Sequence, residues 1–199
     1  MTRVSYAVEG ASDEAIAEIL IATVGREPWR RFTSGGKSRL DPKLPGYNRS
    51  AERQPWLVLR DLDDAPCPAS LVHELIGGGL SAGFALRIPV RAIESWLLAD
   101  RKAFAAFFRV AVRRVPDEPD TLEDPKTAVI DLCRASTSSA IRSGMVPTPR
   151  SGRRVGREYV AMIREYAMTS WRVDVAESTS PSLGRSIARL RDLVAAGAW

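Results

Sequence analysis

Histidine and cysteine are nearly absent from this chain of 199 residues. There is one histidine, His73, and the two cysteines, Cys67 and Cys133, form neither a C-x-x-C pair nor part of a Cys/His cluster. A zinc site is therefore not expected, and a histidine-based nuclease mechanism lacks its second histidine. Because no disulfide framework is indicated, a reducing cytoplasm is the expected setting.

Long apolar runs are also missing. No segment approaches the roughly 20 apolar residues that a membrane helix needs, and the N-terminal stretch reaches Glu9 and Asp13 before any apolar run. We therefore expect neither membrane spanning nor secretion. The length nevertheless suffices for one hydrophobic core, since a domain of this size buries roughly 70% of its unfolded surface.

Lysine is scarce, and arginine carries most of the positive charge. The 29 basic residues include only four lysines, and the formal net charge is +5. Permanently charged guanidinium groups suit a polyanionic partner. A compositional bias of the source genome would explain the same excess, so charge alone does not assign a nucleic-acid function.

Short apolar segments alternate with helical patterns over the first 100 residues. Strands are predicted at 3–8, 29–33, 56–59 and 84–90. Ser12 is expected to cap a helix after the first strand, and Gly77 to end a helix after the third. This alternation is typical of an α/β fold with a mostly parallel sheet covered on both faces.

The remaining segments have less regular patterns. The Gly- and Pro-rich stretch 34–54 is predicted to be a loop. Beyond residue 100 helices are predicted at 126–135, 156–168 and 182–196. We expect an α/β core over 1–100 and a mainly helical portion over 101–199, packed on the core as one compact unit.

Acidic residues follow two of the predicted strands. Glu9 comes directly after the first strand, and Asp61 and Asp63 follow the strand at 56–59. Ligands of an open parallel sheet bind beyond the carboxyl ends of its strands, and residues two apart on an extended chain point to the same side. Three carboxylates about 5 Å apart would repel by on the order of 3 kcal/mol per pair. A hard dication, Mg²⁺ or Mn²⁺, is expected to neutralise them.

The acidic residues also have a purely structural interpretation. The acids within 61–64 could cap the helix that follows, and Glu94 could pair with Arg91 or Arg87 on a solvated face.

A cluster of arginines lies near the middle of the C-terminal half. Four of them have the spacing i, i+3, i+4, i+7 and would form one positive stripe on a helix: Arg150, Arg153, Arg154 and Arg157. Gly152 and Gly156 favour a loop instead, from which flexible arginines can still hold a nucleic-acid backbone. No spaced aromatic platform for stacking bases is evident. Three tryptophans are expected in the core: Trp56, Trp96 and Trp171.

Two segments resemble the motifs of the Toprim fold. Segment 6–14, YAVEGASDE, resembles the first motif, and segment 58–64, VLRDLDD, resembles the second. Topoisomerases, bacterial primases and the overcoming-lysogenization-defect nucleases share this fold. The whole chain is similar to a family of small stand-alone prokaryotic Toprim-like proteins, some encoded beside ATPases in phage-defence loci. The likeness continues through Gly35-Gly36-Lys37, Arg91 to Asp100, Asp124-Pro-Lys126, Gly156 to Tyr159 and Ser180 to Leu183.

The resemblance implies roles for the acidic residues. Glu9 would be a metal ligand or general acid/base, and Asp61 and Asp63 would hold magnesium. Asp64 would support its neighbours, and Glu94 would complete a second metal position.

The resemblance also implies basic contacts to phosphate. Lys126 would contact a phosphate or orient a carboxylate as part of the catalytic set. Lys37 and Arg91, with the four arginines of 150–157, are expected to bind nucleic acid.

The implied function is a magnesium-dependent nuclease acting on RNA or DNA, and the implied role is the effector of an anti-phage system with a partner ATPase. The alternative is a non-catalytic Toprim module that binds nucleic acid or a partner protein. Nucleotidyl transfer is disfavoured because no zinc-binding or polymerase-like region is visible. A homodimer is left open.

Overall fold

The computed structural model describes the whole chain, residues 1–199. The chain forms two compact units: unit 1 comprises 1–90 and 182–199, and unit 2 comprises 91–181. The sequence analysis set one boundary at residue 100, whereas unit 2 begins at residue 91 and most of the last helix, α11 (Pro181–Ala195), belongs to unit 1. Behind α11 the indole N–H of Trp199 donates to the Gly83 carbonyl at 3.0 Å, which fastens the C-terminus to unit 1.

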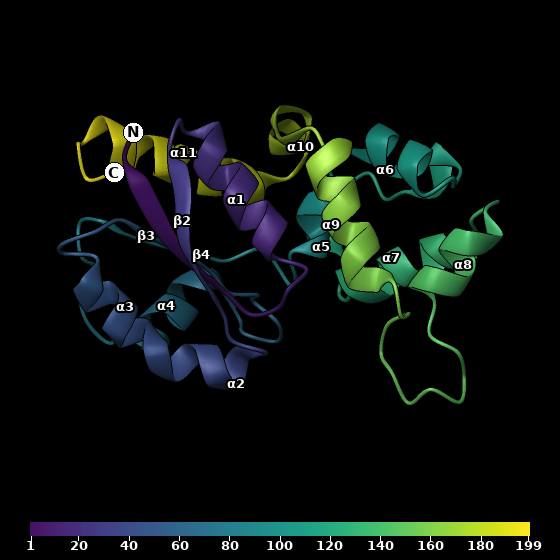
Figure 1. The fold of residues 1–199 in the computed structure, drawn as a ribbon, viewed down its shortest axis with the longest axis horizontal. Coiled ribbons are helices and arrows are strands. Elements are labelled where there is room, and N and C mark those ends of the chain that lie inside the picture. The colour runs from purple at the N-terminus through teal and green to yellow at the C-terminus, as the bar shows by residue number, and fades with distance from the viewer. The chain divides into compact units, whose positions relative to one another are not determined.

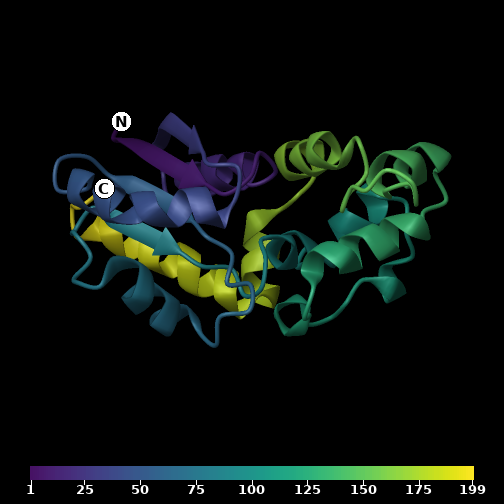
Figure 2. The ribbon, with the colours of Figure 1, turned by 90° about the horizontal axis from the view of Figure 1, so that it is seen from below.

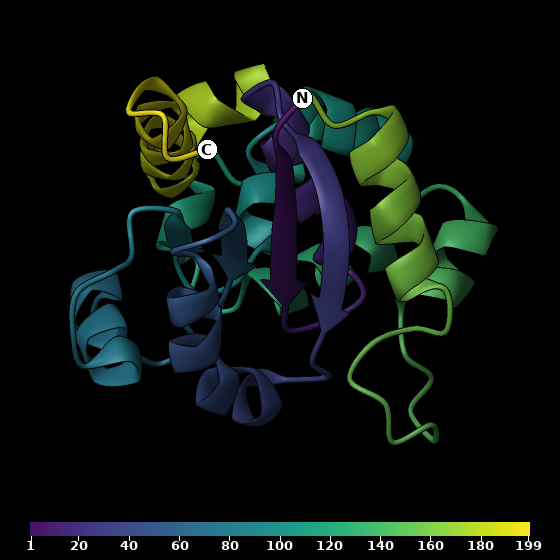
Figure 3. The same ribbon diagram turned by 60° about the vertical axis from the view of Figure 1, so that its left-hand side comes forward.

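Unit 1 contains a sheet of four parallel strands in the order β2-β1-β3-β4. The strands are β1 (Arg3–Val8), β2 (Glu27–Thr33), β3 (Trp56–Leu59) and β4 (Phe84–Arg87). The predicted α/β fold with a parallel sheet is confirmed. Strand β4 is shorter than the predicted 84–90, which agrees with the inability of Pro89 to donate a ladder hydrogen bond. Figure 3 shows β1 and β2 side by side and running the same way.

Helices cover both faces of this sheet (Figure 1). One face carries α1 (Glu14–Thr23) and α11, and Figure 2 shows α11 running alongside the strands. The other face carries α2 (Lys37–Leu40), α3 (Leu44–Ser50) and α4 (Pro68–Ile76), with the 3₁₀ turn η1 (Asp41–Lys43) between α2 and α3. Inward side chains of β3 and β4 meet these helices in one core: Leu40, Leu44, Trp56, Val58, Leu71, Phe84 and Leu86.

The prediction of a loop over 34–54 is wrong, because α2, η1 and α3 occupy that segment. Leu40 and Leu44 are fully buried four residues apart, and Ala51 continues the same apolar side. The two prolines of the segment stand at the first or second position of η1 and α3, where a missing N–H costs little. Helical spacing of the leucines therefore outweighs the turn-like composition.

All regular secondary structure of unit 2 is helical. Its α-helices are α5 (Glu94–Leu98), α6 (Arg101–Phe107), α7 (Pro125–Arg134), α8 (Ser139–Met145), α9 (Tyr159–Thr169) and α10 (Val173–Thr179). Two 3₁₀ turns accompany them, η2 (Val112–Arg114) and η3 (Pro119–Thr121). The mainly helical character expected of the C-terminal portion is confirmed, and α7, α9 and α11 match the three predicted helices within a few residues.

An aromatic cluster and an ion pair with a buried carboxylate stabilise unit 2. The rings of Phe104, Phe108 and Tyr166 lie 4.6 to 5.6 Å apart, centroid to centroid. The carboxylate of Asp100 is fully buried and accepts hydrogen bonds from Nη2 of Arg172 at 2.7 Å and from Nε at 2.8 Å.

None of the helices of either unit combines the length and the apolar character needed to cross a bilayer.

Candidate functional site

The predicted acidic residues meet at the carboxyl edge of the sheet in unit 1. Strand β1 leads to β2 on one side, while β3 lies on its other side, so the strand order reverses between β1 and β3. Open α/β sheets bind ligands at such a reversal, beyond the strand ends. Ala7 lies opposite Val58 in the register of the two strands, which places Glu9 and Asp61 just past neighbouring ends.

Glu9 is held by hydrogen bonds from two directions. Its Oε1 accepts the backbone N–H of Asp61 at 2.9 Å, which ties the end of β3 to the end of β1. Its backbone carbonyl accepts the N–H groups of Gly35 and Gly36 at 2.8 and 2.9 Å. Both glycines have positive φ, 76° and 118°, a conformation that other residues rarely adopt. The segment after β2 therefore folds back onto Glu9.

Partial burial changes the acidity of Glu9. Its side chain is 16% exposed. Burial raises the pKa of Glu9, against the lowering effects of the Arg60 charge and the hydrogen bond from Asp61. Glu9 thus holds a proton more readily than an exposed glutamate does.

Arg60 lies among the carboxylates of unit 1, a feature that the sequence analysis missed. Its Nη1 is 2.8 Å from Asp63 Oδ2 and 3.4 Å from Glu9 Oε1, and its Nε is 2.9 Å from Asp41 Oδ1. Burial opposes the charge of Arg60, but the hydrogen bond to Asp41 and the three carboxylates raise its pKa. Arg60 stands in the second motif, directly before Asp61, so its closeness to the acids could have been inferred from the sequence. Its partner Asp41 is 19 residues away, in the segment that was predicted to be a loop.

Asp63 has a second basic partner and an unusual backbone. Lys37 Nζ lies 3.0 Å from Asp63 Oδ2, so this predicted nucleic-acid contact pairs with a predicted metal ligand. The φ of Asp63 is +51°, in the left-handed region that non-glycine residues seldom enter. Asp61 is partly buried, and Asp64 is exposed. The helix-capping alternative for these acids is wrong, because the N-cap of α4 is Cys67, whose Sγ accepts the Ser70 N–H.

The acids suit a hard cation by chemistry but are not grouped around one. Glu9, Asp61 and Asp63 offer the oxygen donors that magnesium prefers. No group of three acidic, histidine or cysteine side chains stands close enough to hold a metal directly. Arg60 and Lys37 occupy the Asp63 carboxylate instead. The donor set fits magnesium provided that the cation replaces these basic partners.

The turn after Glu9 differs in detail from the prediction. Helix α1 begins at Glu14, and Asp13 rather than Ser12 stands at the N-cap. The Asp13 carboxylate accepts the Gly10 N–H at 2.9 Å and the Ser12 hydroxyl at 2.8 Å. The first-motif residues after Glu9 therefore form a self-bonded turn that fixes the exit of β1.

Three of the resemblance motifs come together within unit 2. Glu94 on α5 is fully buried; its Oε1 accepts the Tyr159 hydroxyl at 2.8 Å and lies 3.3 Å from Lys126 Nζ. Its Oε2 is buried without a hydrogen bond. Lys126 therefore forms an ion pair with a carboxylate, and its part in the catalytic set stays a prediction. A metal at Glu94 stays a prediction.

The arginine-rich segment of unit 2 is irregular, as the glycines indicated. No helix spans 150–157. Arg153 and Arg157 line a hollow of about 290 Å³ together with residues near the end of α8. Arg154 contributes to a low pKa of Asp124, where hydrogen bonds from Thr127 outweigh the raising effect of burial. Arg91, at the start of unit 2, has a φ of +63°.

Comparisons with protein-family models, curated proteins and solved structures gave no match to this chain. Its function therefore has to be argued from the sites themselves and from the motifs.

Proposed function

We propose that the acidic site of unit 1 is a magnesium- or manganese-dependent nuclease site of the Toprim type, acting on RNA or DNA. The observation that carries the proposal is the junction of Glu9 and Asp61 at neighbouring strand ends, where Asp61 N–H and Glu9 Oε1 are 2.9 Å apart. The strand reversal at this point and the two sequence motifs support it.

In this proposal Asp61 and Asp63 hold the cation, with Glu9 beside them and Asp64 in support. A bound magnesium would supply positive charge at the scissile phosphate, where negative charge develops during hydrolysis. The chain itself supplies the proton acceptor. Burial raises the pKa of Glu9, and Oε1 is engaged by Asp61, so Oε2 is the atom placed to take a proton from the attacking water.

Arg60 and Lys37 have two successive roles in this proposal. In the absence of a cation they neutralise Asp63 and Glu9, which would otherwise repel one another. Once a cation takes over those oxygens, the freed guanidinium and ammonium groups can donate to the phosphate of a bound strand. Lys37 is half-exposed and can turn outward at little cost, whereas Arg60 stays anchored by Asp41.

The test is cleavage of labelled RNA and DNA in the presence of Mg²⁺ or Mn²⁺. Glu9→Gln and Asp61→Asn keep the shape of each side chain, and each is expected to lower the cleavage rate at least about 100-fold. Asp192→Asn, an exposed acid on α11, is the charge-matched control and should cleave at the wild-type rate. Unchanged cleavage by Glu9→Gln or Asp61→Asn, with folding intact, would sink this mechanism.

A second candidate is a non-catalytic module that binds nucleic acid or a partner protein. The arrangement of Arg60 favours it, because one guanidinium already satisfies Asp41, Asp63 and Glu9 without a metal. Binding of nucleic acid with no turnover in either cation would select this candidate.

The biological role that accompanies the nuclease proposal is the toxic effector of an anti-phage system in the cytoplasm, kept silent by a partner ATPase. This role comes from the family resemblance alone. Co-purification with the product of an adjacent ATPase gene, with and without ATP, tests it; no complex under either condition would remove the idea.

A further inference from the structure

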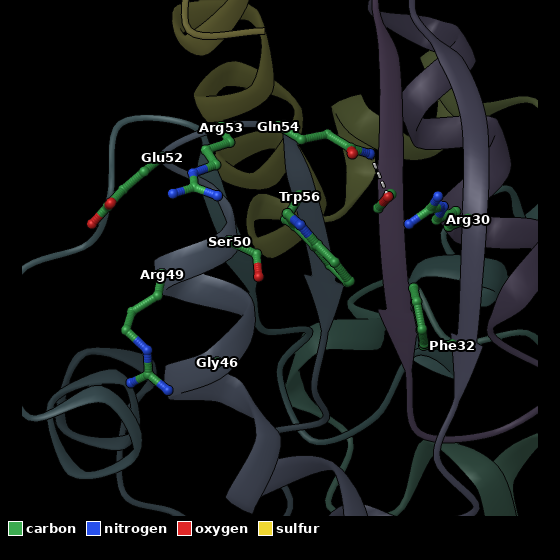
Figure 4. A pocket seen from close by; sticks show the side chains of 10 residues that line it. Arg30, Phe32, Gly46, Arg49, Ser50, Glu52, Arg53, Gln54 and Trp56 are labelled. Carbon is green, nitrogen blue, oxygen red and sulfur yellow. Dashed lines mark hydrogen bonds between the residues drawn. The ribbon is translucent and has the colours of Figure 1, made fainter.

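A hollow beside the edge strand of unit 1 lies apart from the acidic site. Its volume is about 670 Å³, within the range of about 300 to 1,000 Å³ that ligand sites occupy. Strands β1, β2 and β3 form its wall, and α3 with the turn that follows forms its opposite side (Figure 4). Strand β2 pairs only with β1, so no further strand covers this side of the sheet.

Aromatic rings from three separate segments line or support the hollow. Phe32 of β2 lies 5.3 Å from Trp56 of β3, centroid to centroid, with 31° between the ring planes. Tyr47 of α3 stacks on Trp56 at 4.5 Å. Trp56 is buried, whereas Phe32 is 39% exposed. The set therefore presents one open ring, Phe32, backed by two rings that hold it in place.

Three arginines line the same hollow. Arg30 approaches from β2, and Arg49 and Arg53 from α3 and the turn after it, as Figure 4 shows. None of the three has a carboxylate partner, and Glu52 is the one acid among the lining residues. Arg30 rests on the ring of Trp29 at 4.2 Å, which limits its mobility. An exposed aromatic ring can stack on a planar ring, and nearby guanidinium groups can bind phosphates. The hollow therefore suits a ligand that carries both.

We propose that this hollow binds single-stranded nucleic acid, with one base stacked on Phe32 and the adjoining phosphates on Arg30, Arg49 and Arg53. Stacking on an aromatic side chain requires an unstacked base, which a single strand offers and a duplex does not. As the place where a substrate docks, the hollow rests on the proposed function; binding itself is measurable without cleavage.

The course of β2 connects the hollow with the acidic site inside unit 1. Phe32 is followed within three residues by Gly35, whose N–H donates to the Glu9 carbonyl, and then by Lys37, which pairs with Asp63. Ser5 of β1, which lines the hollow, lies four residues before Glu9, a separation of roughly 13 Å at about 3.3 Å per residue. A strand seated on Phe32 could therefore extend along β2 to the acids.

The test is fluorescence anisotropy of the full chain with labelled twelve-residue oligo-dT and oligo-U, in EDTA so that no cleavage occurs. Wild type is expected to bind both. Phe32→Ala is expected to weaken binding about 5- to 100-fold, and Phe32→Tyr, which keeps the ring, to bind as wild type. Arg49→Gln/Arg53→Gln should lower the slope of log K against log salt by about 0.7 for each phosphate that the variant no longer neutralises.

Matched controls separate this site from general charge and exposed apolar surface. Met168→Ala removes an apolar side chain that is 52% exposed on α9 of unit 2 and is not among the residues lining the hollow. Arg113→Gln removes one exposed positive charge from unit 2. Both should bind the oligonucleotides within about twofold of wild type, and thermal melting should show all variants folded.

Several outcomes would overturn the inference. They are wild-type affinity in folded Phe32→Ala, no binding by wild type in EDTA, or a duplex of the same length binding as tightly as the single strand. Full competition by a free mononucleotide would assign the hollow to a small ligand and overturn it as well. Failure of the nuclease proposal can be told apart from failure of this inference. In that case Asp61→Asn would cleave at the wild-type rate, whatever the oligonucleotide-binding data show.

Discussion

Arg60 and Glu9 meet at the carboxyl edge of the sheet, where Nη1 of the arginine lies 3.4 Å from Oε1 of the glutamate. The same guanidinium contacts Asp63 and Asp41. Its side chain is only 6% exposed, so water has little access to the guanidinium group. Under the proposed function, the site would be a balance between two positive occupants, the buried arginine and a cation from solution.

Replacing Arg60 tests this balance. Arg60→Met leaves Glu9, Asp41 and Asp63 without their shared partner and is expected to lower the free energy of unfolding by about 2 to 4 kcal/mol. Mn²⁺ or Mg²⁺ should then restore stability, by about 2.7 kcal/mol when the cation concentration is 100 times its dissociation constant. The same cation concentration should stabilise Arg60→Met more than it stabilises wild type. Thermal or urea unfolding with and without the cation measures both effects.

Lys37→Met is the control for that experiment. Its side chain is half-exposed, and exposed ion pairs contribute only about 0 to 1 kcal/mol. A large loss of stability in Arg60→Met with no recovery in either cation would show that these acids stabilise the fold by pairing with Arg60 and do not bind a metal.

Asp100 gives the helical unit a defined dependence on pH. Burial works against its charge, but hydrogen bonds from Arg172 and from the Ala103 N–H lower the pKa of Asp100 below the usual value. An acid with a lowered folded-state pKa stabilises the fold above its unfolded pKa, near 3.9, and loses that contribution as the pH falls through the folded value. Asp100→Asn should therefore cost about 1 to 3 kcal/mol at pH 7 and make the stability less sensitive to pH below about 4.

Urea unfolding at pH 7 and at pH 3 checks this expectation. Asp131→Asn, an exposed acid on α7, should change stability by less than about 0.5 kcal/mol at either pH. An equal stability loss in Asp100→Asn at both pH values would contradict the linkage.

Gly156 has a packing role that explains why a glycine stands at the start of the segment 156–159. A Cβ on this residue would stand 2.5 Å from the Met145 carbonyl carbon and still closer to the Gly144 carbonyl oxygen. The Gly156 N–H also donates to the Met145 carbonyl at 3.0 Å, so the two backbones are locked together. Gly156→Ala is expected to lower stability by about 1 to 3 kcal/mol, because backbone must move to admit the methyl group.

Gly79→Ala is the matched control, since nothing lies within 4 Å of its Cβ position. Its melting temperature should stay at or slightly above that of wild type. A wild-type melting temperature for Gly156→Ala would mean that the α8–α9 connection is looser than this packing implies.

The sequence predicted the sheet well because its strands are short, apolar and bounded by turns. Glu9 and Asp61 could be placed at strand ends from these patterns alone, because each acid closely follows a short apolar segment. The helices within 37–50 could not be predicted in this way, because Gly36, Pro42 and Pro45 are typical of turns. The helical spacing of Leu40 and Leu44 favours helices only because both side chains pack against the sheet.

The charges around the acids were harder to predict, because ion pairs across the fold leave no local pattern. Nothing in the spacing of Arg60 and Asp41 indicates that they meet, and the site was therefore expected to need a metal for neutrality. The aromatic cluster was missed for the same reason: Phe32, Tyr47 and Trp56 stand on β2, α3 and β3 and come together only when α3 packs against the sheet.

The most direct measurement of the central claim is isothermal titration of Mn²⁺ and Mg²⁺ into wild type and into Asp61→Asn/Asp63→Asn. Asparagine tolerates the left-handed backbone of residue 63, so the double variant should remain folded. The account predicts cation binding in wild type, tighter binding in Arg60→Met, and none in the double variant. Binding of equal strength in wild type and the double variant, or no binding in wild type even with an oligonucleotide present, would contradict it.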